Sequence, residues 1–185
     1  PAEIVKGAVH ACDRVDAQLI LVGREEQVQA ELDQYEGRYE PGQIVVRNAE
    51  EDIEGDDHPV QAIRRKKNSS MLTAIDMGRD GKADAALSAG NTGALMVGSL
   101  MHLGRLDGVD RPAIVYPLPN ISAPGFSLLV DAGANAECKA SHLLGFARMG
   151  TVYMKTAFGI EAPRVGLINI GTEETKGTEM LKEAY

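Results

Sequence analysis

Short continuous apolar runs alternate along this chain with segments in which apolar residues recur every three to four positions. A short run is typical of a strand buried on both faces, whereas the wider spacing marks one face of a helix. The expected strands are residues 19–22, 44–46, 83–87, 113–115, 126–130 and 165–168. The expected helices lie around residues 4–12, at 25–33, after Pro59, after Ser69 or Ser70, at 92–104, at 141–157 and from 177 onward.

This alternation predicts an α/β fold in which βα units stack into three α/β/α layers around a mostly parallel sheet. With 185 residues and 44% hydrophobic content, the chain can bury one sizeable core, or one core and part of another. It contains no internal repeat, low-complexity tract or clear linker. A single compact α/β domain over residues 1–185 is therefore the expected organisation.

Three of the expected strands run directly into polar loops that contain glycine, at residues 88–93, 131–135 and 169–177. Open α/β sheets bind ligands beyond the carboxyl ends of their strands, where such loops meet helix N-termini. Glycine in any one of these loops can also serve only to make a tight turn. Three such loops in one chain favour a ligand site.

The loop at residues 88–93 has the chemistry of a phosphate site. It offers two hydroxyls, one amide and the backbone N–H groups at the start of a helix, where anions bind readily. The predicted phosphate-binding residues are Ser88, Gly90, Asn91, Thr92 and Gly93. The chain has neither the P-loop pattern nor a glycine fingerprint for dinucleotides, so nucleoside triphosphates and NAD are not indicated.

Four contiguous cations, Arg64, Arg65, Lys66 and Lys67, stand in a chain whose net charge is −8. This acidic balance argues against general binding to nucleic acid. Four consecutive residues cover all faces of a helical turn, so at least one cation should point inward, within reach of phosphate. All four are candidates for binding an acidic partner, although a solvated helix face is the alternative interpretation.

The remaining polar residues indicate no metal site and no cofactor. The four histidines and the thiols of Cys12 and Cys138 show no metal-ligand spacing. The acidic segment 50–57 lacks the pattern of a calcium loop and is expected to be solvated. Two thiols without a signal peptide favour the reduced cytoplasm. No apolar run reaches the roughly 18 residues that span a bilayer.

Five motifs together resemble the bacterial acyl-carrier-protein:phosphate acyltransferases of phospholipid synthesis, the PlsX family. They are residues 59–71 (PVQAIRRKKNSSM), 83–96 (ADAALSAGNTGALM), 110–113 (DRPA), 131–135 (DAGAN) and 163–177 (PRVGLINIGTEETKG). The resemblance implies conversion of acyl carrier protein thioester and inorganic phosphate into acyl phosphate. It also implies a fold related to phosphotransacetylases and isocitrate/isopropylmalate dehydrogenases, a homodimer, and a cytoplasmic enzyme loosely associated with the membrane.

The implied reaction assigns roles to residues of the glycine-containing loops. Attack of phosphate on a thioester passes through an oxyanion and expels a thiolate, so it needs neither a metal nor an enzyme nucleophile. Positioning and electrostatics should dominate, with backbone N–H groups as oxyanion donors. Lys176 would neutralise the phosphate, while Asn169, Thr172 and Asp131 would orient substrate or the lysine. A carboxylate such as Asp131 can equally be a helix cap or a structural partner.

Two alternatives to this function remain open. The first is a phosphotransacetylase-like reaction with acyl-coenzyme A, whose nucleotide phosphates would also suit the basic run. The second follows from the family pattern, in which a strand and a polar loop precede the position of Pro1 and the chain continues about as long again beyond Tyr185. A fragment of such an enzyme could be a noncatalytic module for carrier binding or dimerisation.

Overall fold

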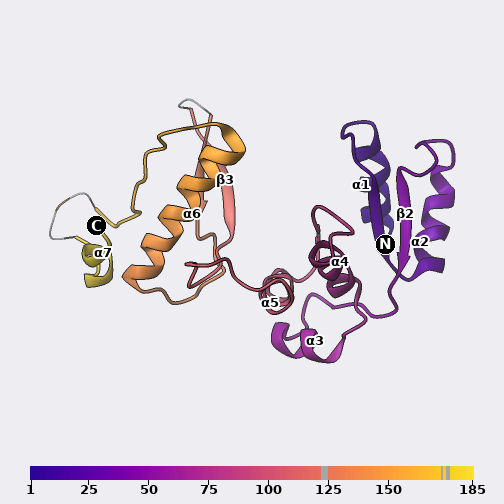
Figure 1. Cartoon of the computed structure of the whole chain (residues 1–185), viewed down its shortest axis with the longest axis horizontal. Coiled ribbons are helices and arrows are strands. Elements are labelled where there is room, and N and C mark those ends of the chain that lie inside the picture. The colour runs from indigo at the N-terminus through magenta and orange to yellow at the C-terminus, as the bar shows by residue number, and fades with distance from the viewer. Residues whose placement is uncertain (122–124, 172, 174–175) are drawn as a thin grey trace. The chain divides into compact units, whose positions relative to one another are not determined.

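A computed structural model describes residues 1–121, 125–171, 173 and 176–185 of the chain. These residues form two compact units, Pro1–Gly104 and Arg105–Tyr185, whose elements are labelled in Figure 1. Each unit has its own packing and its own candidate site residues. No helix among the described residues has the length and apolarity needed to cross a bilayer.

The first unit begins with two parallel strands that share one core with two helices. The elements are α1 (Ala2–Cys12), β1 (Leu19–Gly23), α2 (Glu25–Leu32), the short 3-10 helix η1 (Asp33–Tyr35) and β2 (Ile44–Asn48). Leu19 of β1 pairs with Ile44 of β2, so Leu21 and Val46 share their face and enter the core. Val45 points to the opposite face and is 41% exposed. β2 is therefore buried on one face only.

Three helices complete the first unit around a second core. They are α3 (Pro59–Arg65), α4 (Ser70–Arg79) and α5 (Thr92–His102). The core side chains are Ile63 of α3, Met71, Leu72 and Ile75 of α4, and Ala94 of α5. Gly98 lets α5 approach its neighbours, because a Cβ there would lie 3.0 Å from Ile75 Cδ1 and 3.1 Å from Ile63 Cδ1.

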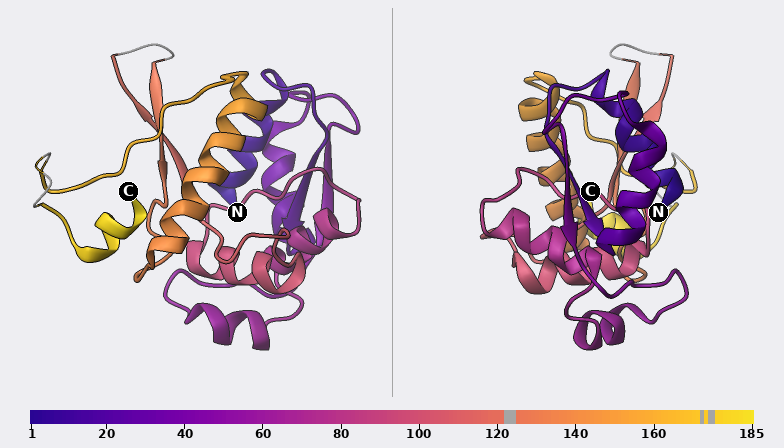
Figure 2. Two further views of the ribbon diagram at one scale, coloured as in Figure 1. Left: turned by 60° about the vertical axis from the view of Figure 1, so that its left-hand side comes forward. Right: turned by 90° about the vertical axis from the view of Figure 1, so that its right-hand side faces the viewer.

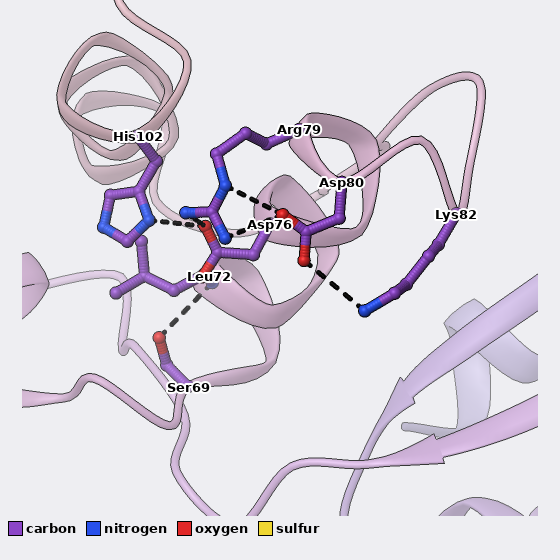
Figure 3. A network of polar contacts seen from close by, with 7 residues as sticks. All are labelled: Ser69, Leu72, Asp76, Arg79, Asp80, Lys82 and His102. Carbon is purple, nitrogen blue, oxygen red and sulfur yellow. Dashed lines mark hydrogen bonds and ion pairs between the residues drawn. The ribbon is translucent and has the colours of Figure 1, made fainter.

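Polar contacts fix the ends of α4 and the last turn of α5, as Figure 3 shows. Ser69 caps α4 by accepting a hydrogen bond from Leu72 N at 3.4 Å. At the other end, Asp76 Oδ1 lies 2.6 Å from His102 Nδ1 of α5 and 2.7 Å from an Arg79 guanidinium nitrogen. Arg79 also contacts Asp80, which in turn meets Lys82 at 3.4 Å. The Asp76–His102 contact therefore joins α4 directly to α5.

The second unit consists of a hairpin and two helices. The elements are β3 (Val115–Pro119), β4 (Phe126–Val130), α6 (Ala140–Phe158) and α7 (Glu179–Ala184). β3 and β4 are antiparallel, and α6 lies beside the hairpin in Figures 1 and 2. The rings of Phe126 and Phe158 pack with centroids 4.6 Å apart. Helix α6 ends at Gly159, whose left-handed φ of +67° suits a C-cap without a side chain.

The structure confirms the α/β class and corrects several strands. The antiparallel pair departs from a mostly parallel sheet, and β3 lies two residues beyond its expected start. Pro117 and Pro119 cannot donate to a ladder, which restricts β3 to an edge. The expected strands at 83–87 and 165–168 were wrong, since neither is paired. Leu87 is 97% exposed and Ile168 76%, so these apolar segments lack the neighbour that a strand needs.

The close approach at Gly98 makes a prediction about stability. Substitution of Gly98→Leu places a side chain against Ile75 and Ile63, and we expect a loss of about 1–3 kcal/mol, as for overpacked cores. Urea unfolding followed by circular dichroism measures this change. Gly78→Ala in α4 is the control, because a Cβ at Gly78 meets nothing within 4 Å. Equal stability of both variants would contradict the packing described here.

Candidate functional site

The loop at residues 88–93 leads into the first turn of α5. Asn91 is the N-cap, and its Oδ1 accepts a hydrogen bond from Ala94 N at 2.9 Å. Within the loop, Gly90 N donates to Ser88 Oγ at 3.2 Å. Thr92 is exposed at the first helical position. The N–H groups of Thr92 and Gly93 lie in the first turn of α5, where backbone N–H groups have no acceptor within the helix.

The side-chain amide of Asn91 is committed to a distant part of the chain. Its Nδ2 donates to the backbone oxygens of Glu54, Gly55 and Asp57 at 3.2, 3.3 and 3.0 Å. Because Oδ1 is occupied by Ala94 N, both ends of the amide serve the protein itself. Direct contact between this side chain and phosphate would require some of these bonds to break. Asn91 therefore holds the loop in place.

Two glycines seat this loop against the neighbouring helices. A Cβ at Gly93 would lie 2.8 Å from Pro59 Cγ, so the start of α5 rests on the start of α3. A Cβ at Gly90 would lie 3.6 Å from Met71 Cε of α4. The predicted phosphate residues are thus gathered where the first turns of these helices meet. An anion here would meet the backbone N–H groups and the positive end of the α5 dipole.

The basic run divides into one inward cation and three outward ones. Arg64 and Arg65 end α3, and both are exposed, as is Lys67. Lys66 turns inward, with 30% of its side chain exposed, and its ammonium group donates to Asp52 O at 2.8 Å and to Asp57 Oδ2. The inward cation thus contacts the acidic segment, not the glycine loop.

Asp57 and Lys66 stabilise each other's charged forms. The hydrogen bond from Lys66 is the main cause that lowers the pKa of Asp57, and a second bond from Glu54 N acts in the same direction. The hydrogen bond to Asp57 likewise raises the pKa of Lys66. His58 occupies the N-cap position of α3, so Asp57 lies one residue before the cap. The acidic segment is consequently an ordered part of the site and not simply a solvated loop.

In the second unit, the carboxylate of Asp131 organises the loop that follows β4. Oδ1 accepts from Ile114 N at 2.8 Å and from Ala134 N at 3.1 Å. Oδ2 accepts from the backbone and side-chain nitrogens of Asn135 at 2.8 and 3.0 Å. Burial opposes the charge, but these hydrogen bonds outweigh it and lower the pKa of Asp131. The charged carboxylate of Asp131 therefore orients the backbone of this loop.

The loop at residues 169–177 is closed by Asn169. Its Nδ2 donates to Lys176 O at 3.3 Å and its Oδ1 accepts from Ile170 N at 2.8 Å. Gly177 adopts a φ of +94°, and a Cβ there would lie 2.8 Å from Asn169 Oδ1. The Lys176 side chain is exposed and has no ion pair within the described part of the chain. Thr172 lies outside the described residues.

The predicted site residues therefore fall into three groups. The phosphate loop and the basic run belong to the first unit and are connected through the acidic segment. Asp131 and the Asn169–Lys176 loop belong to the second unit, and no hydrogen bond joins these two loops among the residues described. In the same residues, no group of three or more His, Cys, Asp or Glu side chains is arranged to hold a metal.

Comparison with known proteins identifies the family. A family model described as "Fatty acid synthesis protein" matches residues 1–185. The chain belongs to this family. Among curated relatives, the phosphate acyltransferase of Desulfitobacterium hafniense (strain DSM 10664 / DCB-2) is 49% identical over 185 residues, covering 100% of this chain and 54% of the relative.

Two further relatives carry the same name. The phosphate acyltransferase of Pelotomaculum thermopropionicum is 52% identical over 186 residues, with 100% of this chain and 53% of the relative covered. That of Bacillus licheniformis is 44% identical over 186 residues, with 100% and 54% covered. The chain thus spans about half the length of the curated relatives it matches.

Sequence reasoning missed the structural part played by Asp52 and Asp57. The available signal was the spacing of Asp57 and Lys66, which lie on either side of the short helix α3. Residues on either side of such a helix can form an ion pair only if the chain before or after the helix folds back along it. The sequence alone does not reveal that return.

Asp131 provides a test of the loop after β4. We expect Asp131→Asn to lose about 1–3 kcal/mol near neutral pH, because one carboxylate oxygen is replaced by a donor that faces N–H groups. A lowered pKa contributes stability above the usual value of 3.8, and this is lost as pH falls through the folded value. The difference between variant and wild type should therefore shrink in acid. Unfolding at several pH values measures it, with the exposed Asp107→Asn as control; a pH-independent difference would contradict this role.

Proposed function

We propose that the complete enzyme transfers a fatty acyl group from acyl carrier protein to inorganic phosphate and so forms acyl phosphate for phospholipid synthesis. The observation that carries this proposal is the capped, accessible first turn of α5, an anion-binding element in a chain of this family. The curated relatives named phosphate acyltransferase add support, since their name specifies an acyl group and phosphate.

In this mechanism the phosphate lies at the first turn of α5, near the Thr92 hydroxyl and the N–H groups of Thr92 and Gly93. One phosphate oxygen attacks the thioester carbonyl carbon, a C–O bond forms, and the C–S bond breaks to release the carrier thiolate. Backbone N–H groups stabilise the intermediate oxyanion, and each can lower the barrier by about 3–4 kcal/mol. The family resemblance assigns a charge-neutralising role to Lys176 and orienting roles to Asn169 and Thr172, all in one loop of the second unit. Asp131 acts by holding its loop.

The exposed cations Arg64, Arg65 and Lys67 would receive the carrier protein. Acyl carrier proteins are acidic, and a chain with a net charge of −8 repels them unless it offers a local positive patch. These three side chains are exposed, whereas Lys66 is paired with Asp57. The patch would raise the rate of encounter and set the orientation of the carrier.

For the complete enzyme we also infer the family's three-layer α/β/α architecture, related to the isocitrate and isopropylmalate dehydrogenases. Its parallel pairing is represented here by β1 and β2. A homodimer in the cytoplasm, peripherally associated with the membrane, completes the proposal on the basis of the family resemblance.

The reaction itself is the first test. Incubation of the chain with long-chain acyl carrier protein should yield free thiol and hydroxamate-trappable acyl phosphate, both dependent on added phosphate. The full-length Desulfitobacterium relative is the positive control, and circular dichroism verifies the fold. Carrier binding without either product would instead support a noncatalytic module. Preferential consumption of acyl-coenzyme A in a competing reaction would favour the phosphotransacetylase-like alternative.

The basic patch predicts a salt-dependent affinity for the carrier. We expect each of Arg64→Gln, Arg65→Gln and Lys67→Gln to raise the Kd for acyl carrier protein by about 1.5–5-fold, because an exposed ion pair contributes about 0.2–1 kcal/mol. Higher ionic strength should reduce the difference. Fluorescence anisotropy with labelled carrier measures the Kd. Lys6→Gln, at an exposed position of α1, is the control for loss of one charge; an equal effect at Lys6 would contradict a local docking patch.

A further inference from the structure

Lys66 and the phosphate loop are connected by an unbroken series of contacts. The Lys66 ammonium group binds Asp52 O at 2.8 Å and Asp57 Oδ2 at 2.5 Å. It therefore ties the residue after α3 to both ends of the segment Asp52–Asp57. The two acceptors, which belong to different residues, together define the position of the Lys66 ammonium group.

The carboxylate of Asp57 also closes the turn in which it lies. Its Oδ2 accepts from Glu54 N at 2.8 Å, and Asp57 N donates to Glu54 O at 3.3 Å. One carboxylate thus holds the turn Glu54–Asp57 and Lys66 together. Loss of its charge would weaken both connections, because hydrogen bonds to charged groups are stronger than those between neutral groups.

The same turn directs its carbonyl oxygens at Asn91. The oxygens of Glu54, Gly55 and Asp57 lie 3.0–3.3 Å from Asn91 Nδ2. Asn91 Oδ1 then accepts from Ala94 N and fixes the first turn of α5. The position of this first turn consequently depends on a turn that is 34–37 residues away in sequence.

We propose that Lys66 and Asp57 are positioning residues for the phosphate site, acting through the turn Glu54–Asp57 and Asn91 on the first turn of α5. This inference rests on the proposed function, because it takes that first turn as the phosphate site. Lys66 acts within the protein, whereas its neighbours Arg64, Arg65 and Lys67 face outward.

Simple electrostatics and positioning make opposite predictions for Asp57→Asn. Removal of a negative charge near an anion site strengthens phosphate binding if charge alone matters. Under the positioning role the variant weakens binding, because the turn loses the charged partner of Lys66. Asp56→Asn is the matched control, since Asp56 is the exposed neighbour with the same charge. Lys6→Met, at an exposed position of α1, is the corresponding control for Lys66→Met.

Inorganic phosphate is titrated into the isotope-labelled chain, and the amide signals of Thr92 and Gly93 report binding. We expect Asp57→Asn and Lys66→Met each to raise the Kd for phosphate at least about fivefold, with the double variant no weaker than either single one. Asp56→Asn should leave the Kd unchanged or lower it. Lys66→Arg, which keeps the charge and the fold, should recover much of the affinity lost in Lys66→Met. Tighter binding by Asp57→Asn would overturn the positioning role.

Amide hydrogen exchange without phosphate separates this inference from the proposed function. Asp57→Asn should speed exchange at Ala94, whose N–H is bonded to Asn91 Oδ1, but not at Leu103, whose N–H is bonded to Ser99 O at the far end of α5. Unchanged exchange at Ala94 would overturn the link even if wild type binds phosphate. If exchange at Ala94 is faster in Asp57→Asn but wild type binds no phosphate, the phosphate assignment fails, while the link from Asp57 to the first turn of α5 stands.

Discussion

The hydrogen bonds of the Asn91 side chain are the constraint on which the arrangement of the helical half of the first unit depends. An amide that donates to three carbonyl oxygens and accepts one backbone N–H fixes two segments at once. It sets the start of α5, and the contact between Gly93 and Pro59 then sets the start of α3. At the other end of α5, His102 meets Asp76 of α4. Between these two ends, Gly98 allows the close packing of the core.

This arrangement also balances charge within the turn Glu54–Asp57. The turn that holds Asn91 carries negative charges of its own, and Lys66 compensates Asp57 by direct contact. The turn presents the carbonyl oxygens of Glu54, Gly55 and Asp57 to Asn91 Nδ2. The four consecutive basic residues of the run 64–67 therefore serve different purposes. Lys66 stabilises the interior of the unit, while Arg64, Arg65 and Lys67 give the surface its positive charge.

Much of the fold could be predicted because its signals are local. Helices α2, α5 and α6 follow from apolar spacing and from caps, as at Asn91, and β1, β2 and β4 follow from short apolar runs. The strands expected at 83–87 and 165–168 failed because an apolar run indicates burial without supplying a neighbouring strand. The start of a helix at Thr92 was predicted correctly, whereas the orientation of Asn91 and Lys66 depends on contacts with a distant turn.

The two loops that carry predicted site residues, one in each unit, are organised by different kinds of contact. The loop at residues 88–93 is held by hydrogen bonds from Asn91 to the turn Glu54–Asp57, which precedes α3. Its geometry therefore does not require residues 83–87 to pair as a strand. The loop at 169–177 is held by Asn169 through bonds to Ile170 N and Lys176 O, which are contacts within the loop. It follows Ile168, which is 76% exposed. Lys176 therefore follows a segment that no strand pairing holds among the described residues, whereas the first turn of α5 is fixed by contacts within its own unit.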